Sequence, residues 1–409
     1  MGSEMCIRDS HYAGSPEMGM EFRTYYLASE WVKMGHNVTI IAGDYSHLRR
    51  KNPKVSENFQ TEIIDGIKYM WIKTGEYDGN GVKRAMSMFR FVSTLRKNAR
   101  DIVENENPDV VITSSTYPLD TFAGQKMKKI KKDIKLVHEI HDMWPITLIE
   151  VGNMPKYHPF VVMMQIGENS FCKNSDYVCS LLPAAKNYLI KHGMKAEKFF
   201  HVPNGIVESE WENYDKIPED YVKIFDKIHS EGKKVICFFG SHTKSYCLDN
   251  LAKACIDNDD VAAVFIGGGI YKKELMEKYS KYEDSIYFLD SISKTSIPDL
   301  FNYIDATYVA AMDNDMFRYG VCMNKLFDSM MGAKPIIYAI NAPNNYIVDY
   351  NCGINVESEN LEELKKGIEK FVNLDEETLN KMGKNGRKAI EENFTYHKLA
   401  EKFLKGLEN

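Results

Sequence analysis

The sequence has few of the features that mark membrane-spanning, metal-scaffolded or nucleic-acid-binding proteins. It contains no run of about 18 apolar residues, which argues against a membrane-spanning helix. Its eight cysteines are scattered and form no CxxC pair, so neither a metal site nor a disulfide framework is expected, and a reducing compartment suits them. The net charge of −6 argues against general nucleic-acid binding. No secretory signal pattern is seen, and we expect a cytoplasmic protein.

What is present indicates a two-domain α/β protein. A chain of 409 residues, 44% apolar and 27% charged, has the length of two domains and the composition of a globular protein. Apolar, β-branched runs alternate with helical patterns, which is typical of α/β layers around parallel sheets. We predict a first domain over residues 1–205, a linker over 206–233, a second domain over 234–390 and a terminal helix segment over 391–409.

The same alternation predicts the individual elements. In the first half we expect a helix over residues 21–34 and strands over 37–42, 110–113, 136–140 and 177–180. The second half restarts with strands over 234–240, 261–269, 286–289, 306–310 and 335–339, and apolar spacing predicts a last helix over 396–407. Two doubly wound domains follow, with ligands expected in a cleft outside the carboxyl ends of the strands.

The first ten residues do not fit this pattern. A βαβ domain with a glycine loop near residues 14–19 needs an apolar strand immediately before that loop. Only residues 5–7 supply one, and Arg8 and Asp9 are expected to cut it short. We interpret residues 1–10 as translated adapter or assembly sequence in place of the true first strand. An authentic divergent start is the alternative.

The stretch from Arg318 to Asp328 carries the strongest functional signal, because it reads as a loop that opens into a short helix. The first turn would leave free backbone amides, those of Val321 and Cys322 among them, beside the cations of Arg318 and Lys325. A helix N-terminus of this kind binds phosphate. The Asp328 carboxylate accepts hydrogen bonds only, which suits the hydroxyls of a ribose. The pattern predicts a nucleotide-diphosphate site; the alternative is an ordinary surface helix.

Several short motifs resemble those of one enzyme family. Asn-Lys-Leu-Phe-Asp at residues 324–328, followed by Gly-Ala-Lys-Pro-Ile, resembles the donor-binding motif of the retaining family 4 glycosyltransferases with the GT-B fold. Residues 11–19, 35–43, 141–145 and 202–206 resemble further motifs in the family's order. The similarity is greatest to the O-antigen, capsule and exopolysaccharide branch, which includes N-acetylfucosamine and N-acetylglucosamine transferases. It implies two Rossmann-like domains facing a cleft, with a C-terminal helix that crosses back to the first domain.

The resemblance implies a donor site with two departures from the family. Ser241 and Cys247 stand where many members have an Arg and a Lys, and Gly320 stands where the first of two acids is usual. Lys325 is expected to supply the missing positive charge. The expected donor-binding residues are Gly19, Gly240, His242, Lys244, Ile292, Arg318, Gly320, Val321, Asn324, Lys325, Leu326 and Asp328.

The predicted catalytic residues are His141 and Asp142 in the first domain, together with Lys325 as the group that stabilises the leaving diphosphate. His141 and Asp142 follow the strand over 136–140, where the cleft is expected, and Trp144 would line an acceptor site. The alternative is a buried histidine held by the backbone, with Trp144 in the core. The family implies retention of configuration, a UDP-sugar as donor, and neither a metal nor another cofactor.

Two basic segments lie in the predicted acceptor domain. Residues 82–100, from Val82 to Arg100, hold six basic residues and no acid, and residues 126–135 hold six lysines and one Asp. Met86, Phe89 and Val92 give the first segment an apolar stripe at helical spacing. Such a helix can lie on anionic lipid, where a lipid-linked acceptor is found. The alternative is a core helix with a solvated, charged back.

We therefore predict a glycosyltransferase that moves a sugar from a UDP donor to a lipid-linked polysaccharide precursor at the inner face of the plasma membrane. Its expected partners are the nucleotide sugar, a glycan or lipid-linked glycan and an anionic membrane surface, and no nucleic acid. Two alternatives stay open. One is a UDP-sugar 2-epimerase. The other is a non-catalytic nucleotide-sugar-binding partner subunit, which the absent acid at Gly320 suggests.

Overall fold

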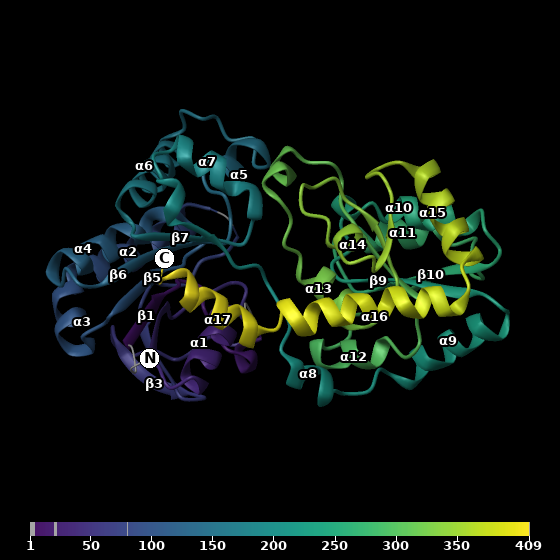
Figure 1. The fold of residues 1–409 in the computed structure, drawn as a ribbon, viewed down its shortest axis with the longest axis horizontal. Coiled ribbons are helices and arrows are strands. Elements are labelled where there is room, and N and C mark those ends of the chain that lie inside the picture. Colours follow the sequence, from purple (N-terminus) through teal and green to yellow (C-terminus); the bar gives the residue numbers. More distant parts are fainter. Residues whose placement is uncertain (1–4, 20–22, 80, 409) are drawn as a thin grey trace. The chain divides into compact units, whose positions relative to one another are not determined.

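The chain forms two compact units, each built around its own sheet (Figure 1). The computed structural model describes residues 5–19, 23–79 and 81–408. The first unit comprises Met1–Pro203 together with Tyr396–Asn409, and the second comprises Asn204–Thr395. The C-terminal segment therefore returns to the unit in which the chain begins.

The first unit contains an eight-stranded sheet with the strand order β3-β4-β2-β1-β5-β6-β7-β8. All neighbours in it are parallel except β3 and β4, which pair antiparallel at one edge. The strands are β1 Met5–Asp9, β2 Asn37–Gly43, β3 Gln60–Ile64, β4 Ile67–Ile72, β5 Val110–Thr113, β6 Lys135–Ile140, β7 Tyr177–Ser180 and β8 Phe199–His201.

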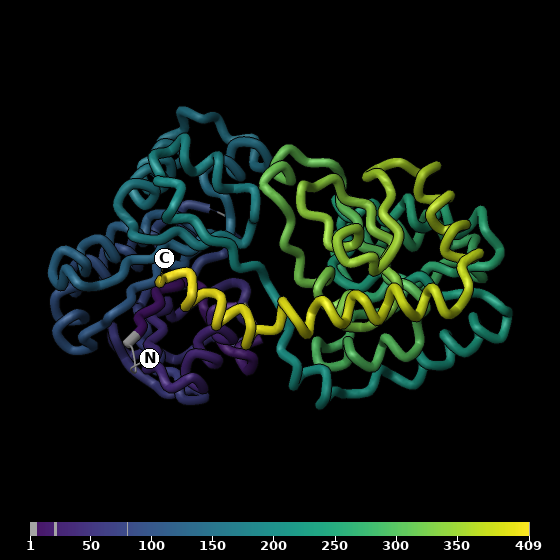
Figure 2. Tube along the Cα trace, viewed as in Figure 1, coloured from purple at the N-terminus to yellow at the C-terminus, as the bar shows by residue number. Residues whose placement is uncertain are grey.

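Helices pack against this sheet, and one of them comes from the far end of the chain. The C-terminal helix α17 (Tyr396–Gly406) packs on α1 (Arg23–Lys33), where the Trp31 ring lies 5.1 Å from the Phe403 ring and Trp31 Nε1 donates to the Ala400 carbonyl at 3.3 Å. Figure 2 shows the yellow C-terminal segment beside the purple start of the chain. The other helices are α2 Val82–Lys97, α3 Ala99–Glu106, α4 Thr121–Ile130, α5 Ile146–Glu150, α6 Pro159–Asn174 and α7 Lys186–Lys191.

The expectation that Arg8 and Asp9 cut the first strand short is wrong for this structure. Strand β1 includes both residues and lies in the middle of the sheet, paired with β2 on one side and β5 on the other. The buried Arg8 guanidinium pairs with the Glu139 carboxylate and lies 5.8 Å from the Trp31 ring centre. An opposite charge and an aromatic face accommodate a cation that would otherwise end the strand.

The second unit contains a six-stranded parallel sheet with the order β11-β10-β9-β12-β13-β14. Its strands are β9 Lys234–Phe239, β10 Val261–Ile266, β11 Ile286–Leu289, β12 Ala306–Ala310, β13 Ile336–Ala339 and β14 Gly353–Asn355. Its helices are α8 Glu208–Glu212, α9 Glu219–Ser230, α10 Leu248–Ile256, α11 Lys272–Tyr279, α12 Ile297–Leu300, α13 Asn324–Met331, α14 Tyr346–Asp349, α15 Leu361–Asn373 and α16 Glu376–Asn393.

Both faces of this second sheet are buried. Alternate residues of β9 enter different apolar clusters: Ile236 and Phe238 pack on one side, and Val235 and Cys237 on the other. A strand covered on both faces reads as a continuous apolar run, which is why β9 and β10 were recognisable in the sequence. The predicted α/β architecture of two doubly wound sheets is confirmed. No helix in the described ranges is long and apolar enough to cross a membrane.

Candidate functional site

The second unit contains a pocket of about 320 Å³ at the carboxyl ends of three neighbouring strands. The turn after β9 supplies Gly240 and Ser241, the turn after β10 supplies Gly267 and Gly268, and Ile292 follows β11. Parallel sheets bind ligands at this edge. Two predicted donor-site positions, Gly240 and Ile292, thus line one pocket. The full lining is Phe239, Gly240, Ser241, Ile266, Gly267, Gly268, Ser291, Ile292 and Ile297.

Glycines let the two main turns of the pocket touch. Gly240 and Gly267 have φ angles of 134° and 143°, which disfavour other residues, and a Cβ added to Gly267 would lie 2.0 Å from the Gly240 carbonyl oxygen. The Gly240 amide donates to the Ile266 carbonyl at 2.9 Å, and the His242 amide donates to the Gly268 carbonyl at 2.7 Å. These two amides hold the turns together, so a donor-binding role of Gly240 and His242 cannot use them.

Two side chains expected in the donor site lie elsewhere. The His242 ring is fully buried among Phe238, Phe265 and Phe288, and burial lowers its pKa to about 4. It is therefore a neutral core residue. Lys244 is exposed and pairs with Glu274 of α11 at 3.1 Å. Its charge is therefore already matched on the surface by Glu274. The residues Lys244–Tyr246 form a single 3₁₀ turn, and helix α10 begins only at Leu248.

The expected phosphate-binding turn around Val321 also needs correction. Helix α13 begins at Asn324, so Val321 and Cys322 precede it, and the Val321 amide donates to the Asn344 side chain at 2.9 Å. Leu326 is buried in the apolar core beneath the helix, and Asn324 is exposed at its first turn. Arg318 donates back to the Asp315 carbonyl and stacks on its neighbouring ring, so it covers its own turn.

Lys325 of α13 extends to the pocket turn. Its Nζ lies 3.2 Å from the position that a Cβ of Gly240 would occupy, 3.5 Å from the Tyr246 ring centre and 4.1 Å from the Phe238 ring centre. The nitrogen is buried and, within the described part of the chain, has no hydrogen-bond partner. Burial lowers the pKa of this ammonium to about 7. A buried cation without a counter-ion suits a ligand that brings negative charge.

Asp328 follows Lys325 on α13; its backbone carbonyl accepts from the Gly332 amide at 3.0 Å, and its carboxylate has no hydrogen bond to a residue that the structure describes. Burial raises the pKa of its half-buried carboxyl to about 7. Gly320 has a φ angle of 107° at the end of a short 3₁₀ turn. A side chain there would be strained, which gives a physical reason for the absence of the family's first acid at this position.

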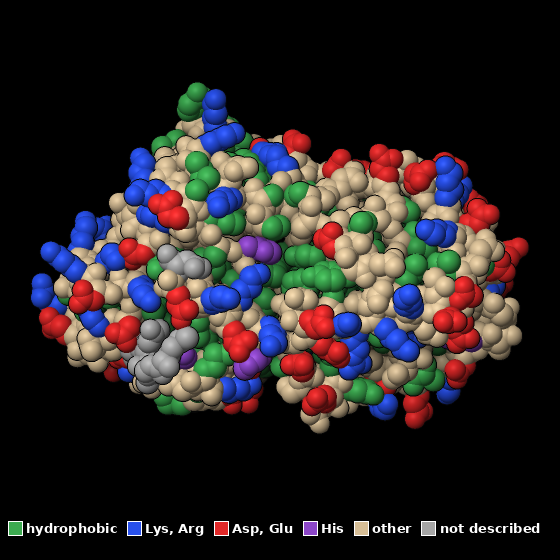
Figure 3. All heavy atoms as spheres, in the orientation of Figure 1, with side chains coloured by type: hydrophobic (Ala, Val, Ile, Leu, Met, Phe, Trp, Pro, Cys, Tyr) green, Lys and Arg blue, Asp and Glu red, His purple; other side chains and the backbone are tan. Residues whose placement is uncertain are grey.

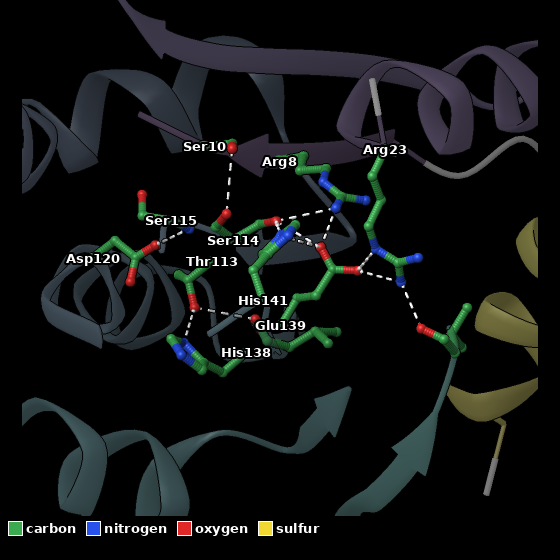
Figure 4. A network of polar contacts seen from close by, with 12 residues as sticks. Arg8, Ser10, Arg23, Thr113, Ser114, Ser115, Asp120, His138, Glu139 and His141 are labelled. Carbon is green, nitrogen blue, oxygen red and sulfur yellow. Dashed lines mark hydrogen bonds and ion pairs between the residues drawn. The ribbon is translucent and has the colours of Figure 1, made fainter. Parts of the chain in front are cut away.

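The first unit places His141 in a buried polar network (Figure 4). Its Nε2 atom lies 2.8 Å from the Ser114 hydroxyl at the end of β5 and 3.0 Å from Oε2 of Glu139, which belongs to β6. Arg23 donates to the other oxygen of Glu139 at 3.0 Å. Sequence reasoning missed Glu139, although a carboxylate in a strand with the apolar residues Leu136, Val137 and Ile140 was a visible signal.

The residues next to His141 in the sequence differ in their exposure to solvent. Asp142 is exposed in the turn after β6. Trp144 is half-buried and packs against Phe160, 6.1 Å between ring centres, so it contributes to the core of this unit. His138 is buried, stacked on Phe171 at 3.8 Å. Of the two predicted catalytic residues of this unit, His141 therefore lies in the buried polar network and Asp142 lies exposed beside it.

The predicted glycine loop also lies at the carboxyl edge of the first sheet. Gly19 has a φ angle of 66°, and a Cβ there would lie 2.8 Å from the Arg50 side chain. Glu17, in the turn before it, is exposed. The start of the helix expected at residue 21 lies outside the described residues, and α1 is described from Arg23.

Family comparisons identify the chain through both units. The family 4 glycosyltransferase model matches residues 18–210, and the model of glycosyl transferases group 1 matches residues 221–389. The chain belongs to the family 4 glycosyltransferases. This confirms the resemblance drawn from the motifs at residues 141–145 and 324–328. A comparison with curated proteins finds no match.

Solved structures show that the fold of this family 4 glycosyltransferase is GT-B. The chain is similar to a glycosyltransferase from Rickettsia africae, with a TM-score of 0.72, 17% identity, and coverage of 99% of this chain and 98% of that one. It is also similar to sucrose-phosphate synthase from Thermosynechococcus elongatus, with a TM-score of 0.71, 13% identity, and coverage of 98% of both chains. The similarity to HepE from Anabaena, in complex with UDP and glucose, has a TM-score of 0.65 and 15% identity, and covers 99% of this chain and 100% of that one. None of these comparisons supports the epimerase alternative.

Proposed function

We propose that this glycosyltransferase transfers a sugar from a UDP-sugar to a lipid-linked polysaccharide precursor, with retention of configuration and without a metal. The observation that carries the donor assignment is the pocket at Gly240, Gly267 and Ile292 with the unpartnered Lys325 beside it. The structure of HepE with UDP and glucose supports a uridine nucleotide as the donor carrier.

The pocket and the polar side chains of α13 each suit one part of such a donor. The backbone around Ile292 offers an amide and a carbonyl to a nucleobase, and Asp328 offers acceptors to the ribose hydroxyls. Lys325 lies where a diphosphate near Gly240 would meet a positive charge. Charge grows on the diphosphate as the glycosidic bond breaks, and a fixed cation in a water-poor site stabilises that charge most strongly.

Calorimetric titration of the full chain with UDP, GDP, ADP and UDP-N-acetylglucosamine tests the donor assignment. We expect UDP and the UDP-sugar to bind more tightly than GDP or ADP, because the pocket beside Ile292 discriminates the base. Adding EDTA is expected to leave the affinity unchanged. Equal affinity for all three diphosphates, or loss of binding in EDTA, would contradict the proposal. Binding of the donor without turnover with any acceptor would favour the partner-subunit alternative.

The acceptor side of the proposal rests on helix α2, which buries one face and exposes an apolar stripe on the other. Met88, Phe91, Val92 and Leu95 are buried, which corrects the expectation that Val92 belongs to the exposed stripe. The exposed stripe consists of Val82, Met86 and Phe89, which are 77%, 46% and 38% exposed. Spacings of four and three residues put these three side chains on one helix face.

Positive charge surrounds this stripe. Lys83, Arg90 and Lys97 are exposed on α2, and the segment carries no acid. Figure 3 shows Lys and Arg side chains, with acidic ones among them, over the end of the first unit where α3 and α4 lie. In the second basic segment, Lys128 pairs with Asp176 at 2.5 Å, so its charge is partly matched. Apolar contact and unmatched cations together suit the headgroup region of an anionic bilayer.

Sedimentation with lipid vesicles tests this surface. We expect the full chain to sediment with phosphatidylcholine vesicles that contain phosphatidylglycerol, and less with phosphatidylcholine alone. Replacing both Met86→Asp and Phe89→Asp is expected to release the protein. Ile63→Asp is the control, because Ile63 is an apolar side chain of the same unit that is 68% exposed on β3 rather than on α2. Equal release by the control would contradict the assignment to α2.

A further inference from the structure

Lys272 lies beside the donor pocket, although the motifs in the sequence did not mark it. It is the first residue of helix α11, which begins shortly after the glycine turn at the end of β10. Its side chain is only 16% exposed. A lysine that is withdrawn from solvent to this extent is normally paired, so the contacts of its ammonium show which parts of the protein it holds.

The Lys272 ammonium has three hydrogens, and all three are engaged. Nζ donates to the Gly267 carbonyl at 2.9 Å, to the Leu289 carbonyl at 2.9 Å and to Oδ1 of Asp290 at 2.7 Å. Gly267 belongs to the turn after β10, Leu289 ends β11, and Asp290 begins the loop that follows β11. The Gly267 amide also donates to the Leu289 carbonyl at 3.2 Å, so backbone and side chain join the same two segments.

These two segments line adjoining parts of the donor pocket. Ser291 and Ile292, which follow Asp290 directly, line it on one segment, and Gly268 lines it on the other. A Cβ added to Gly268 would lie 3.6 Å from Ser291 Oγ, so the two segments lie close together. The bond from Lys272 to Asp290 extends the join beyond the strand, into the loop that carries the predicted base-binding residue Ile292.

The neighbouring contacts join different segments. Backbone hydrogen bonds from Gly240 and His242 join the turns after β9 and β10. The Tyr221 hydroxyl donates to the Asp290 carbonyl at 3.2 Å, which fixes the loop to helix α9 and not to the turn after β10. Lys272 is thus a side chain that joins the loop to the glycine turn, and a mutation can remove this join without changing the backbone.

We propose that Lys272 is a positioning residue that fixes the spacing between Gly268 and Ile292, and thereby the preference of the pocket for uracil over a purine base. A purine is larger than uracil by a second fused ring, so two segments held at a fixed spacing exclude it, and segments that can move apart discriminate less. Because its three hydrogens are engaged, Lys272 acts through the two segments and not by contact with the donor. The inference rests on the proposed function for its ligand, whereas the join itself does not.

Calorimetric titration of the full chain with UDP and with GDP at pH 6.5 tests this role in Lys272→Met. We expect UDP to bind about tenfold more weakly than to the wild type, and the affinity for GDP to change by less than about threefold. Lys273→Met is the matched control, because the neighbouring Lys273 is 89% exposed and its Nζ lies 3.8 Å from Glu277. It is expected to bind both nucleotides as the wild type does.

Asp290→Asn separates the join from the charge of the pair. Its amide oxygen still accepts from the Lys272 ammonium at this largely exposed position, so near wild-type affinities are expected. A loss as large as that in Lys272→Met would show that the charge matters and not the join, and would overturn the proposal.

Equal losses of UDP and GDP affinity in Lys272→Met, or an unchanged affinity for UDP, would also overturn it. Thermal unfolding shows whether this variant folds. If it does not, Lys272→Gln keeps a polar group at the half-buried site, and the same narrowing of the preference for UDP is expected from it. Failure of the wild type to bind UDP would instead contradict the proposed function, so the two failures are distinguishable.

Discussion

The two units differ in how a buried charged side chain is surrounded. In the first unit, the buried Glu139 carboxylate is matched by two guanidinium groups, a hydroxyl and an imidazole. In the second unit, Lys325 is buried between two aromatic rings with no hydrogen-bond partner among the described residues. A satisfied network fixes the geometry of a site, whereas an unsatisfied charge favours whatever ligand completes it. The comparison supports the proposal that the second unit binds the donor at Lys325.

Breaking the satisfied network has the largest expected effect. Arg23→Met removes one partner of a buried carboxylate and the donors to two carbonyls, so we expect the free energy of unfolding to fall by about 3 to 5 kcal/mol. Urea unfolding of the full chain measures it. Arg100→Met is the control, because Arg100 and Glu104 are largely exposed at 3.4 Å and their pairing contributes little. Equal losses in both variants would remove the distinction between the buried and exposed pairs.

The glycine turns of the donor pocket provide the second test. Gly267→Ala would place a Cβ 2.0 Å from the Gly240 carbonyl oxygen at a φ of 143°. We expect the free energy of unfolding to fall by about 2 to 4 kcal/mol and UDP binding to be lost. Gly268→Ala is the matched control in the same turn, because its Cβ would meet only Ser291 Oγ at 3.6 Å. Thermal unfolding and UDP titration of the pair measure both effects. Similar behaviour of the two variants would show that the turn contact does not shape the pocket.

The unmatched cation predicts a pH dependence for donor binding. Because burial lowers the pKa of Lys325 to about 7, the ammonium is present below pH 7 and is lost as the pH rises. We expect the affinity for UDP to fall between pH 7 and pH 9, by up to about tenfold per pH unit. Lys325→Arg keeps its charge throughout this range and is expected not to show this fall in affinity. A flat wild-type profile would mean that a protonated Lys325 is not needed for binding.

The smallest expected effect concerns Asp328. Its folded pKa of about 7 lies above the ordinary value of 3.8, so stability is full below about pH 4 and is lost as the pH rises to 7. Asp328→Asn removes this loss and is expected to raise the free energy of unfolding at pH 8 by about 1 to 2 kcal/mol, with no gain at pH 3.5. It is also expected to weaken binding of UDP, because the ribose loses an ionised acceptor. The same difference in stability between the variant and the wild type at both pH values would contradict the burial argument.

Much of the fold was predictable because burial on both sheet faces leaves long apolar runs. Strands β5, β7, β11 and β12 have the predicted bounds, and the remaining predicted strands differ at their ends. The prediction ended strand β1 before Arg8, because a charged residue is unfavourable in a buried strand. Its partner Glu139, which makes this burial possible, could not be identified from the sequence. Strands β3, β4, β8 and β14 were not anticipated, and β3 is exposed along most of its length, so no apolar run marks it.

The candidate site was less predictable, because it depends on which atoms are already engaged. The positions of Gly240, Ile292 and Lys325 around one turn agree with the motifs in the sequence. Sequence spacing could not show that the amides of His242 and Val321 are used by Gly268 and Asn344, since those partners come from other turns. Spacing also could not show that the His242 ring points into the core.

The most direct test of the donor site compares UDP with UMP, which lacks the outer phosphate. For the wild type at pH 6.5 we expect calorimetry to give tighter binding of UDP by roughly a hundredfold, because a buried cation beside Gly240 pairs with the diphosphate. Lys325→Met fits between the same two rings and is expected to fold, yet to bind UDP and UMP with nearly equal affinity. An unchanged preference for UDP in this variant would contradict the assignment of Lys325 to the diphosphate.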